Sequence, residues 1–348
     1  MLKKKEIVKY LKETDKNKIG ELFEKANKVR FENNGKKVYY RGIVEFSNIC
    51  SKNCLYCGIR RDNKNVERFQ MSEEEILEAA GWAHNSHFGS MVLQSGERND
   101  DEFVEFVSSV LKKIKEKYPQ LGITLSLGEQ TESTYKRWFD LGAHRYLLRI
   151  ETSDENLYKK LHPGDHDFNY RLHCLDLLRK IGYQVGTGVM IGLPYQTEAS
   201  LADDIIFFKE KDIDMIGMGP YIVHEDTPLA KLVKDFDKKR QFDLGLKMIA
   251  LTRLCLEDVN IAATTALQAL HPQGRELGLN CGANIIMPTI TDVKYRKNYL
   301  LYQDKPCTDE TSNMCKACLE RRIKSIGQEI GYDEWGDSPH YFRRTKNA

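Results

Sequence analysis

Apolar and β-branched runs alternate along the chain with stretches whose apolar residues recur every three or four positions. The runs predict eight strands, at residues 38–46, 90–94, 123–127, 145–150, 184–191, 215–221, 260–265 and 284–288. The periodic stretches predict helices at 71–83, 101–118, 171–181, 200–211, 242–256 and 318–330. Ser72, followed by three glutamates, is a typical start for the first of these helices.

Strands that alternate with helices pair in parallel through βαβ units. Eight such units over about 300 residues fit the size of a (β/α)₈ barrel, and a doubly wound open sheet is the alternative. We therefore predict an α/β fold, a complete (β/α)₈ TIM barrel at residues 38–348, preceded at 1–37 by one or two extra helices. In such a barrel the chemistry lies at the carboxyl ends of the strands.

Composition narrows the class of protein. The 348 residues include 53 basic and 51 acidic side chains, a net charge of +2, without the strong basic bias of a nucleic-acid-binding protein. No apolar run approaches the ~20 residues of a membrane span. The first residues lack the apolar core of a secretion signal. We expect a cytoplasmic protein with no nucleic-acid or membrane partner.

Six of the nine cysteines form two tight triplets. Cys50, Cys54 and Cys57 have the spacing C-x3-C-x2-C and directly follow the first predicted strand. Three thiolates this close can bind three irons of a [4Fe–4S] cube and leave the fourth without a protein ligand. A zinc knuckle or incidental thiols are the alternatives.

The second triplet consists of Cys307, Cys315 and Cys318. It predicts either a second iron–sulfur cluster or a structural zinc site. The three remaining cysteines lie in helical apolar patterns, which favours buried small hydrophobic residues over ligands. They are Cys174, Cys255 and Cys281.

The first triplet resembles the signature of the radical S-adenosylmethionine (SAM) enzymes. The resemblance implies that the methionine part of SAM chelates the open iron, and that one electron cleaves SAM to a 5′-deoxyadenosyl radical. More specifically, the chain is similar to the radical SAM maturases of [FeFe]-hydrogenase, with methylornithine synthase and biotin synthase as related barrels. The stretches that carry this similarity are 45–50, 54–63, 92–97, 124–129, 145–149, 263–266 and 281–284.

This family resemblance implies a role in assembling the diiron subcluster of the hydrogenase. The substrate would be a small organometallic species, iron carrying cysteine, CO and cyanide. An external electron donor and other hydrogenase maturation proteins would be the partners. Two alternatives stay open: a methylornithine synthase-like enzyme acting on a small amino acid, and a non-catalytic iron–sulfur carrier.

The resemblance also assigns site residues. The positions implied to hold SAM are Tyr56, Gln94, Gly96, Glu97, Glu151, Arg171 and Met190. Those implied to line the substrate cavity are Thr124, Thr264, Thr265, Met287, Tyr299 and Tyr302, and the implied catalytic positions are Ser126, Arg145 and Arg149. The chain departs from the family at Gln94-Ser95, where a Gly-Gly-Glu is common, and at Ile150, where some relatives have histidine.

Arg145 and Arg149 lie an even number of positions apart on the fourth predicted strand, so both are expected to point into the barrel. Two inward guanidinium groups need anionic partners. A substrate carboxylate or cyanide would supply one. An ion pair with Glu97, Glu129 or Glu151 is the alternative.

Overall fold

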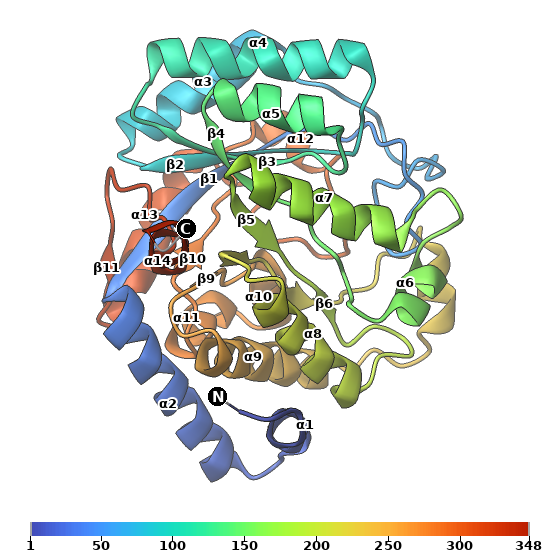
Figure 1. Ribbon diagram of the computed structural model, residues 1–348, viewed down its shortest axis with the longest axis vertical. Coiled ribbons are helices and arrows are strands. Elements are labelled where there is room, and N and C mark those ends of the chain that lie inside the picture. Colours follow the sequence, from blue (N-terminus) through green and yellow to red (C-terminus); the bar gives the residue numbers. More distant parts are fainter. Residues whose placement is uncertain (1, 347–348) are drawn as a thin grey trace.

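A computed structural model describes residues 2–346 and shows parallel strands surrounded by helices (Figure 1). Eight strands neighbour one another in the order β10-β1-β2-β3-β4-β5-β7-β9. They are β1 (Lys37–Ser47), β2 (Ser90–Ser95), β3 (Gly122–Ser126), β4 (Ala143–Leu147), β5 (Gln184–Thr187), β7 (Met215–Ile216), β9 (Asn260–Ile261) and β10 (Ile285–Ile286). All eight predicted strands are therefore present, most of them shorter than predicted.

Three further short strands are present: two form a separate two-stranded sheet and one joins the main sheet. Beyond β5 and β7, the chain continues into β6 (Met190–Ile191) and β8 (Gly219–Pro220), which pair in parallel with each other. The third, β11 (Glu329–Ile330), pairs with the first two residues of β1. The pair β6–β8 lengthens the barrel wall at the carboxyl end.

The eight strands curl through 273°, which leaves a gap between β9 and β10. Two backbone hydrogen bonds cross this gap: the Ala263 amide donates to Ile285 and the Asn284 amide donates to Ile261, each at 2.9 Å. The prediction of a parallel α/β barrel rather than a doubly wound sheet is confirmed. The barrel is partial and open, not the complete barrel that we expected, because two backbone hydrogen bonds rather than a strand ladder join β9 to β10.

The main outer helices lie where the apolar spacing predicts them (Figure 1). They are α3 (Glu73–Asn85), α4 (Asp101–Lys117), α7 (Phe168–Ile181), α8 (Glu198–Glu210) and α9 (Lys238–Cys255). The α3 start is set by a capping box, in which the Ser72 side chain accepts from the Glu75 amide and the Glu75 carboxylate accepts from the Ser72 amide. The pattern did not predict α5 (Glu132–Asp140), α6 (Glu155–Leu161), α10 (Thr265–Leu270), α11 (Gly274–Asn280), α12 (Val293–Arg296), α14 (Pro339–Lys346) or the 3₁₀ helix Pro228–Leu232.

The helix predicted at 318–330 is wrong at both ends. Helix α13 runs from Ser312 to Ser325. It starts early because the Thr311 side chain accepts from the Met314 amide. It ends early because Gly327 adopts a φ of +72°, beyond the last turn.

Two helices precede the barrel, as predicted for residues 1–37. They are α1 (Lys4–Lys12) and α2 (Lys16–Asn34), which pack against α8 and α9 on the outside of the barrel. The Lys247 ammonium of α9 fixes the end of α1 by donating to the carbonyls of Leu11 and Glu13. Residues 1, 347 and 348 lie outside the described part, and the division at residue 37 stays a prediction.

None of the helices within residues 2–346 is both long enough and apolar enough to cross a membrane.

The amino end of the barrel is filled by the C-terminal segment. Arg145 of β4 is fully buried there; its Nε donates to the Asp337 carboxylate at 2.9 Å and its Nη2 to the Trp335 carbonyl at 2.9 Å. Arg41 of β1 lies nearby and donates to the Gly336 carbonyl. Burial alone would raise the pKa of Asp337, but its hydrogen bond with His144 and the charge of Arg145 hold that pKa well below its usual range. Asp337 is thus the counter-charge for the buried arginines.

Asp204 of α8 is expected to make stability depend on pH. Burial raises the pKa of this carboxyl group to about 7, against about 3.9 in an unfolded chain. The folded protein binds the proton more tightly, so the contribution of Asp204 to stability is complete below pH 4 and is lost as pH rises towards 7. We expect Asp204→Asn to stabilise the protein at pH 8 by at most about 4 kcal/mol, and less than half as much at pH 5.

Thermal unfolding at both pH values measures this difference. The carboxamide introduced by Asp204→Asn keeps an oxygen for the Ser153 amide and hydroxyl, which now donate to Asp204 at 2.7 and 2.6 Å. Asp203→Asn is the matched control, because the Asp203 side chain is 48% exposed. An equal Tm shift for Asp204→Asn at pH 5 and pH 8 would assign the effect to packing instead.

Candidate active site at the carboxyl end of the barrel

A cavity of about 330 Å³ opens at the carboxyl ends of the strands. Residues that follow almost every strand of the barrel line it. From the predicted set these are Cys50, Cys54, Cys57, Tyr56, Gln94, Gly96, Glu97, Ser126, Arg149, Glu151, Arg171, Met190, Thr264, Thr265, Met287, Tyr299 and Tyr302. The structure therefore brings together positions that are up to 252 residues apart.

The first cysteine triplet forms a loop directly after β1, and its three side chains face this cavity. Gly96 packs so closely under the loop that an added Cβ would lie 2.3 Å from the Ile49 carbonyl and 2.8 Å from the Cys50 Cβ. The Glu97 amide donates to the Cys50 sulfur at 3.3 Å. Burial raises the pKa of the Cys57 thiol to about 12, so a bound cation is needed to hold the thiolate form.

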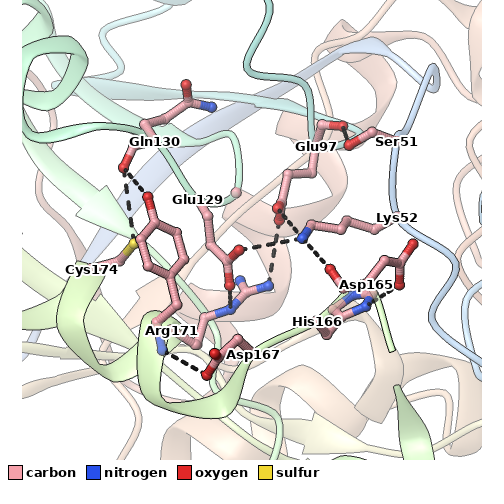
Figure 2. Close-up of polar contacts among 12 residues, drawn as sticks. Ser51, Lys52, Glu97, Glu129, Gln130, Asp165, His166, Asp167, Arg171 and Cys174 are labelled. Atoms are coloured by element: carbon pink, nitrogen blue, oxygen red, sulfur yellow. Dashed lines mark hydrogen bonds and ion pairs between the residues drawn. The ribbon is translucent and has the colours of Figure 1, made fainter. Parts of the chain in front are cut away.

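Four charged side chains lie beside the cysteine loop (Figure 2). The Arg171 Nε is 2.8 Å from Glu129 and its Nη2 is 3.4 Å from Glu97. Lys52, inside the cysteine loop, is 3.6 Å from Glu97 and 3.4 Å from Glu129. Burial would lower the pKa of Arg171, but the two carboxylates raise it well above its usual value, so Arg171 stays charged.

The same four-charge cluster affects Glu97, whose pKa is raised by burial although Arg171 opposes the shift. Sequence reasoning identified Glu97 and Arg171 but missed the role of Lys52, and it named Glu129 only as an alternative ion-pair partner. The available signal was positional, because Lys52 lies between two cysteines and Glu129 follows β3.

A second loop, residues 162–166 between α6 and α7, covers the cysteine loop; we call it the HPGDH segment from its sequence. The Leu55 amide donates to the Leu161 carbonyl at 2.9 Å and Lys52 donates to the Asp165 carbonyl at 2.8 Å. The Tyr56 hydroxyl lies 2.9 Å from the His162 Nε2. Burial lowers the pKa of His162 to about 3. Sequence reasoning missed this segment.

Glu151 and Arg149 form the side of the cavity beside β6. The Arg149 Nη2 lies 3.0 Å from the Glu151 carboxylate and 3.0 Å from the Val189 carbonyl. Glu151 has a φ of +66°, a left-handed backbone that its amide and carbonyl bonds to Gly188 and Met190 maintain. Such backbone strain is concentrated at functional sites.

The opposite wall carries a mixture of polar and aromatic groups. Gln94 donates to the Tyr299 hydroxyl at 3.2 Å. Lys305 and Glu45, both missed by sequence reasoning, form a buried ion pair at 2.6 Å on this wall. The buried Thr264 hydroxyl makes no hydrogen bond to residues 2–346.

Two predicted residues do not line this cavity. Arg145 does point into the barrel, but its partner is Asp337 at the amino end, so neither a substrate anion nor Glu97, Glu129 or Glu151 neutralises it. Thr124 lines a separate small cavity beneath, together with Arg41 and Met215. The alternating strand pattern gives the direction of the Arg145 side chain but not its height along the barrel axis. The assignment of Thr124 came from the family resemblance alone.

The second triplet is only partly assembled. Sulfur atoms of Cys307 and Cys315 and a carboxylate oxygen of Glu310 lie within 4.8 Å of one another. Cys318, one turn further along α13, is not part of that group. Cys174 and Cys281 are buried, as predicted, whereas Cys255 is only half-buried.

Comparison with known proteins identifies the class of this site. Residues 44–208 match the model of the Radical SAM superfamily. The solved structure of methylornithine synthase (PylB) superposes with a TM-score of 0.80 over 96% of this chain and 95% of that chain, at 24% identity. Fold and cysteine loop are thus those of a radical SAM enzyme.

Sequence similarity narrows the class further. The chain is 47% identical over 322 residues to the [FeFe] hydrogenase maturase subunit HydE of Thermotoga maritima. The alignment covers 92% of this chain and 89% of that protein. It is 27% identical over 319 residues to 3-methylornithine synthase of Methanosarcina acetivorans, covering 89% and 85%. The chain belongs to the HydE family of radical SAM enzymes, as its sequence motifs predicted.

Proposed function

We propose that this protein cleaves SAM reductively and uses the radical to convert a small organometallic precursor, iron carrying cysteine, CO and cyanide, during assembly of the [FeFe]-hydrogenase active site. The observation that carries the proposal is the 47% identity, over nearly the whole chain, to a protein named as a maturase of that hydrogenase. Every SAM-binding position implied by the family lines one cavity with the cysteine triplet.

The residues present fit a [4Fe–4S] cluster with SAM. Cys50, Cys54 and Cys57 supply three sulfur ligands on one loop, and the tight packing of Gly96 holds that loop in place. When bound, the cluster and SAM supply the one-electron cleavage that yields a 5′-deoxyadenosyl radical. Tyr56, Gln94, Gly96, Glu97, Glu151, Arg171 and Met190 would hold SAM.

Arg171 is suited to the methionine carboxylate, because its planar guanidinium binds carboxylates through two hydrogen bonds. Its partners Glu97 and Glu129 now fix its orientation at the cavity edge. In this proposal, Glu97 also accepts a hydrogen bond from the methionine ammonium group. The charge cluster therefore offers Arg171 to the carboxylate and Glu97 to the ammonium group of the methionine part of SAM.

The substrate would bind deeper in the cavity. Arg149 carries a buried Nε that makes no hydrogen bond within the described residues, and the Thr264 hydroxyl is equally unpaired. Unpaired buried donors favour an anionic ligand, since they cost free energy until they are bonded. Ser126, Thr265, Met287, Tyr299 and Tyr302 complete this part of the wall; Arg145 and Thr124 have no place in it.

We also propose that Cys307, Cys315 and Cys318 hold a second cluster or metal ion, which would need Cys318 to turn towards Cys307 and Cys315. An external electron donor and other maturation proteins would be the partners. The near-neutral charge of the chain argues against a nucleic-acid partner, and cysteines grouped as ligand triplets rather than as a disulfide framework favour a cytoplasmic location.

The test is electron paramagnetic resonance of the anaerobically reconstituted, reduced protein. We expect SAM to change the cluster spectrum and 5′-deoxyadenosine to form on reduction. An unchanged spectrum from a cluster confirmed to be present would contradict the proposal and favour an iron–sulfur carrier. A second assay combines the protein with the partner maturases and measures whether the hydrogenase becomes active. Activation distinguishes the maturase from an enzyme acting on a free amino acid.

A further inference from the structure

The HPGDH segment places two imidazoles beside one of the cluster cysteines. The Cys54 sulfur and one ring nitrogen each of His162 and His166 lie within 4.8 Å of one another, and the His166 Nε2 is 3.1 Å from the Cys54 sulfur. His162 is 6% exposed. The proposed reaction uses neither histidine, so this buried group of metal-binding atoms lacks an explanation.

Both rings are held in the tautomer that a metal ion requires. The His162 Nδ1 lies 2.8 Å from the Tyr158 carbonyl, and the His166 Nδ1 lies 2.8 Å from the Asp165 carboxylate (Figure 2). A carbonyl and a carboxylate only accept hydrogen bonds, so each Nδ1 carries the hydrogen. The His166 Nε2 then faces the Cys54 sulfur, whereas the His162 Nε2 lies 2.9 Å from the Tyr56 hydroxyl and gives up that contact when it binds a metal ion. Metal-ligating histidines show this arrangement, with the second nitrogen bonded to a carboxylate or carbonyl.

The two loops are also fixed to each other around this group. Leu55 bonds to Leu161 through the backbone, and the Lys52 ammonium binds the Asp165 carbonyl. One thiol and two imidazoles are the ligand types that zinc prefers, and its bond lengths place the ligand atoms roughly 3.5 Å apart. Small side-chain rotations are therefore enough to close a site.

We propose that the protein, before its iron–sulfur cluster is assembled, binds one Zn²⁺ through the Cys54 sulfur and the Nε2 atoms of His162 and His166. A water molecule or the Tyr56 hydroxyl takes the fourth position. Binding releases the thiol proton of Cys54 to solvent. Because Cys54 is also a cluster ligand, the zinc ion and the complete cluster exclude each other.

This site makes zinc a competitor of cluster assembly. Zn²⁺ binds nitrogen and sulfur ligands more tightly than Fe²⁺ does. A protein that has taken up zinc keeps Cys54 from iron until the zinc is removed.

The test is a titration of the cluster-free full-length protein with Co²⁺, which reports thiolate coordination by its charge-transfer absorption. A Cys315→Ala background keeps the second triplet from contributing. We expect one tetrahedral Co²⁺ per chain, displaced by Zn²⁺. The double variant His162→Gln/His166→Gln and the variant Cys54→Ala each weaken binding by at least about tenfold.

Two matched variants locate the metal. Cys50→Ala removes a neighbouring thiol of the same loop, and His173→Gln removes an exposed imidazole of α7; both keep wild-type Co²⁺ affinity. If Cys50→Ala weakens binding as much as Cys54→Ala while the double histidine variant binds normally, the ion lies on the cysteine triplet and the proposal is wrong.

A second measurement does not depend on the folding of variants. Wild-type protein preloaded with one equivalent of Zn²⁺ should incorporate iron and sulfide more slowly, and a chelator should restore the rate. Unchanged cluster incorporation, with zinc shown to be bound, overturns the competition. Neither readout uses SAM cleavage, so failure here is distinguishable from failure of the proposed enzymatic function.

Discussion

Cys54→Ala is expected to abolish formation of 5′-deoxyadenosine, whereas Cys315→Ala should leave it largely intact. Cys54 lies in the loop that lines the cavity with the SAM-binding positions, and its loss leaves two thiols, too few to hold the cluster. Cys315 lies near the far end of the chain in α13, is not among the residues that line this cavity, and is close to Cys307. Chemical reduction of each reconstituted variant with SAM, followed by quantification of 5′-deoxyadenosine, measures the difference.

Cys255→Ala is the control for loss of a thiol as such, because Cys255 is the last residue of α9 and belongs to neither triplet. Its iron content and SAM cleavage should equal those of the wild type. If Cys315→Ala also removed all cleavage, the second triplet would be needed for the reaction and its peripheral role would be disproved.

Arg171→Gln should remove SAM binding and also destabilise the fold by about 3–5 kcal/mol, the usual result of breaking a buried ion pair. The substitution leaves Glu97 and Glu129 with only the more distant Lys52 as counter-charge. Burial already raises the pKa of Glu97, and loss of the opposing Arg171 charge raises it further. A raised folded pKa means that stability is lost as pH increases, so the destabilisation should be larger at pH 8 than at pH 5. Urea unfolding at both pH values and SAM titration measure the two effects.

A second substitution separates the two effects of Arg171→Gln. Adding Glu129→Gln removes one unpaired charge and should restore part of the stability without restoring SAM affinity. Lys180→Gln, on the same helix α7, is the control, because its pair with Glu132 is exposed and worth about 0–1 kcal/mol. Recovery of SAM binding in the double variant would show that Arg171 acts only through the fold.

The barrel and its cysteine loop could be predicted because short-range patterns determine them, whereas the other site residues were assigned by the family resemblance. Strands β1 to β4 follow apolar runs, and Cys50 to Cys57 form one continuous motif. Position along the barrel axis is different: Arg145 and Arg149 have the same inward direction, but only packing with Asp337 shows that Arg145 lies at the amino end. That contact spans 192 residues, and no local pattern encodes it.

The HPGDH segment was missed for a related reason. His162 and His166 lie on a loop with no helical or strand period, and their relation to Cys54 appears only when α6 and α7 are placed beside the cysteine loop. A pair of histidines around Pro163-Gly164 was the available signal. Glu45 and Lys305 lie at opposite ends of the barrel sequence, and no local sequence pattern predicts their pairing.

The pairing of Arg145 with Asp337 also determines when, during synthesis of the chain, the amino end of the barrel can be completed. Every strand of the barrel leaves the ribosome before Asp337 does, and at 5–20 residues per second the interval from Arg145 is roughly 10–40 s. During that time the guanidinium of β4 lacks its carboxylate and cannot be buried without cost. The amino end of the nascent barrel therefore stays hydrated until the last segment arrives, whereas the cysteine loop at the other end has already been synthesised.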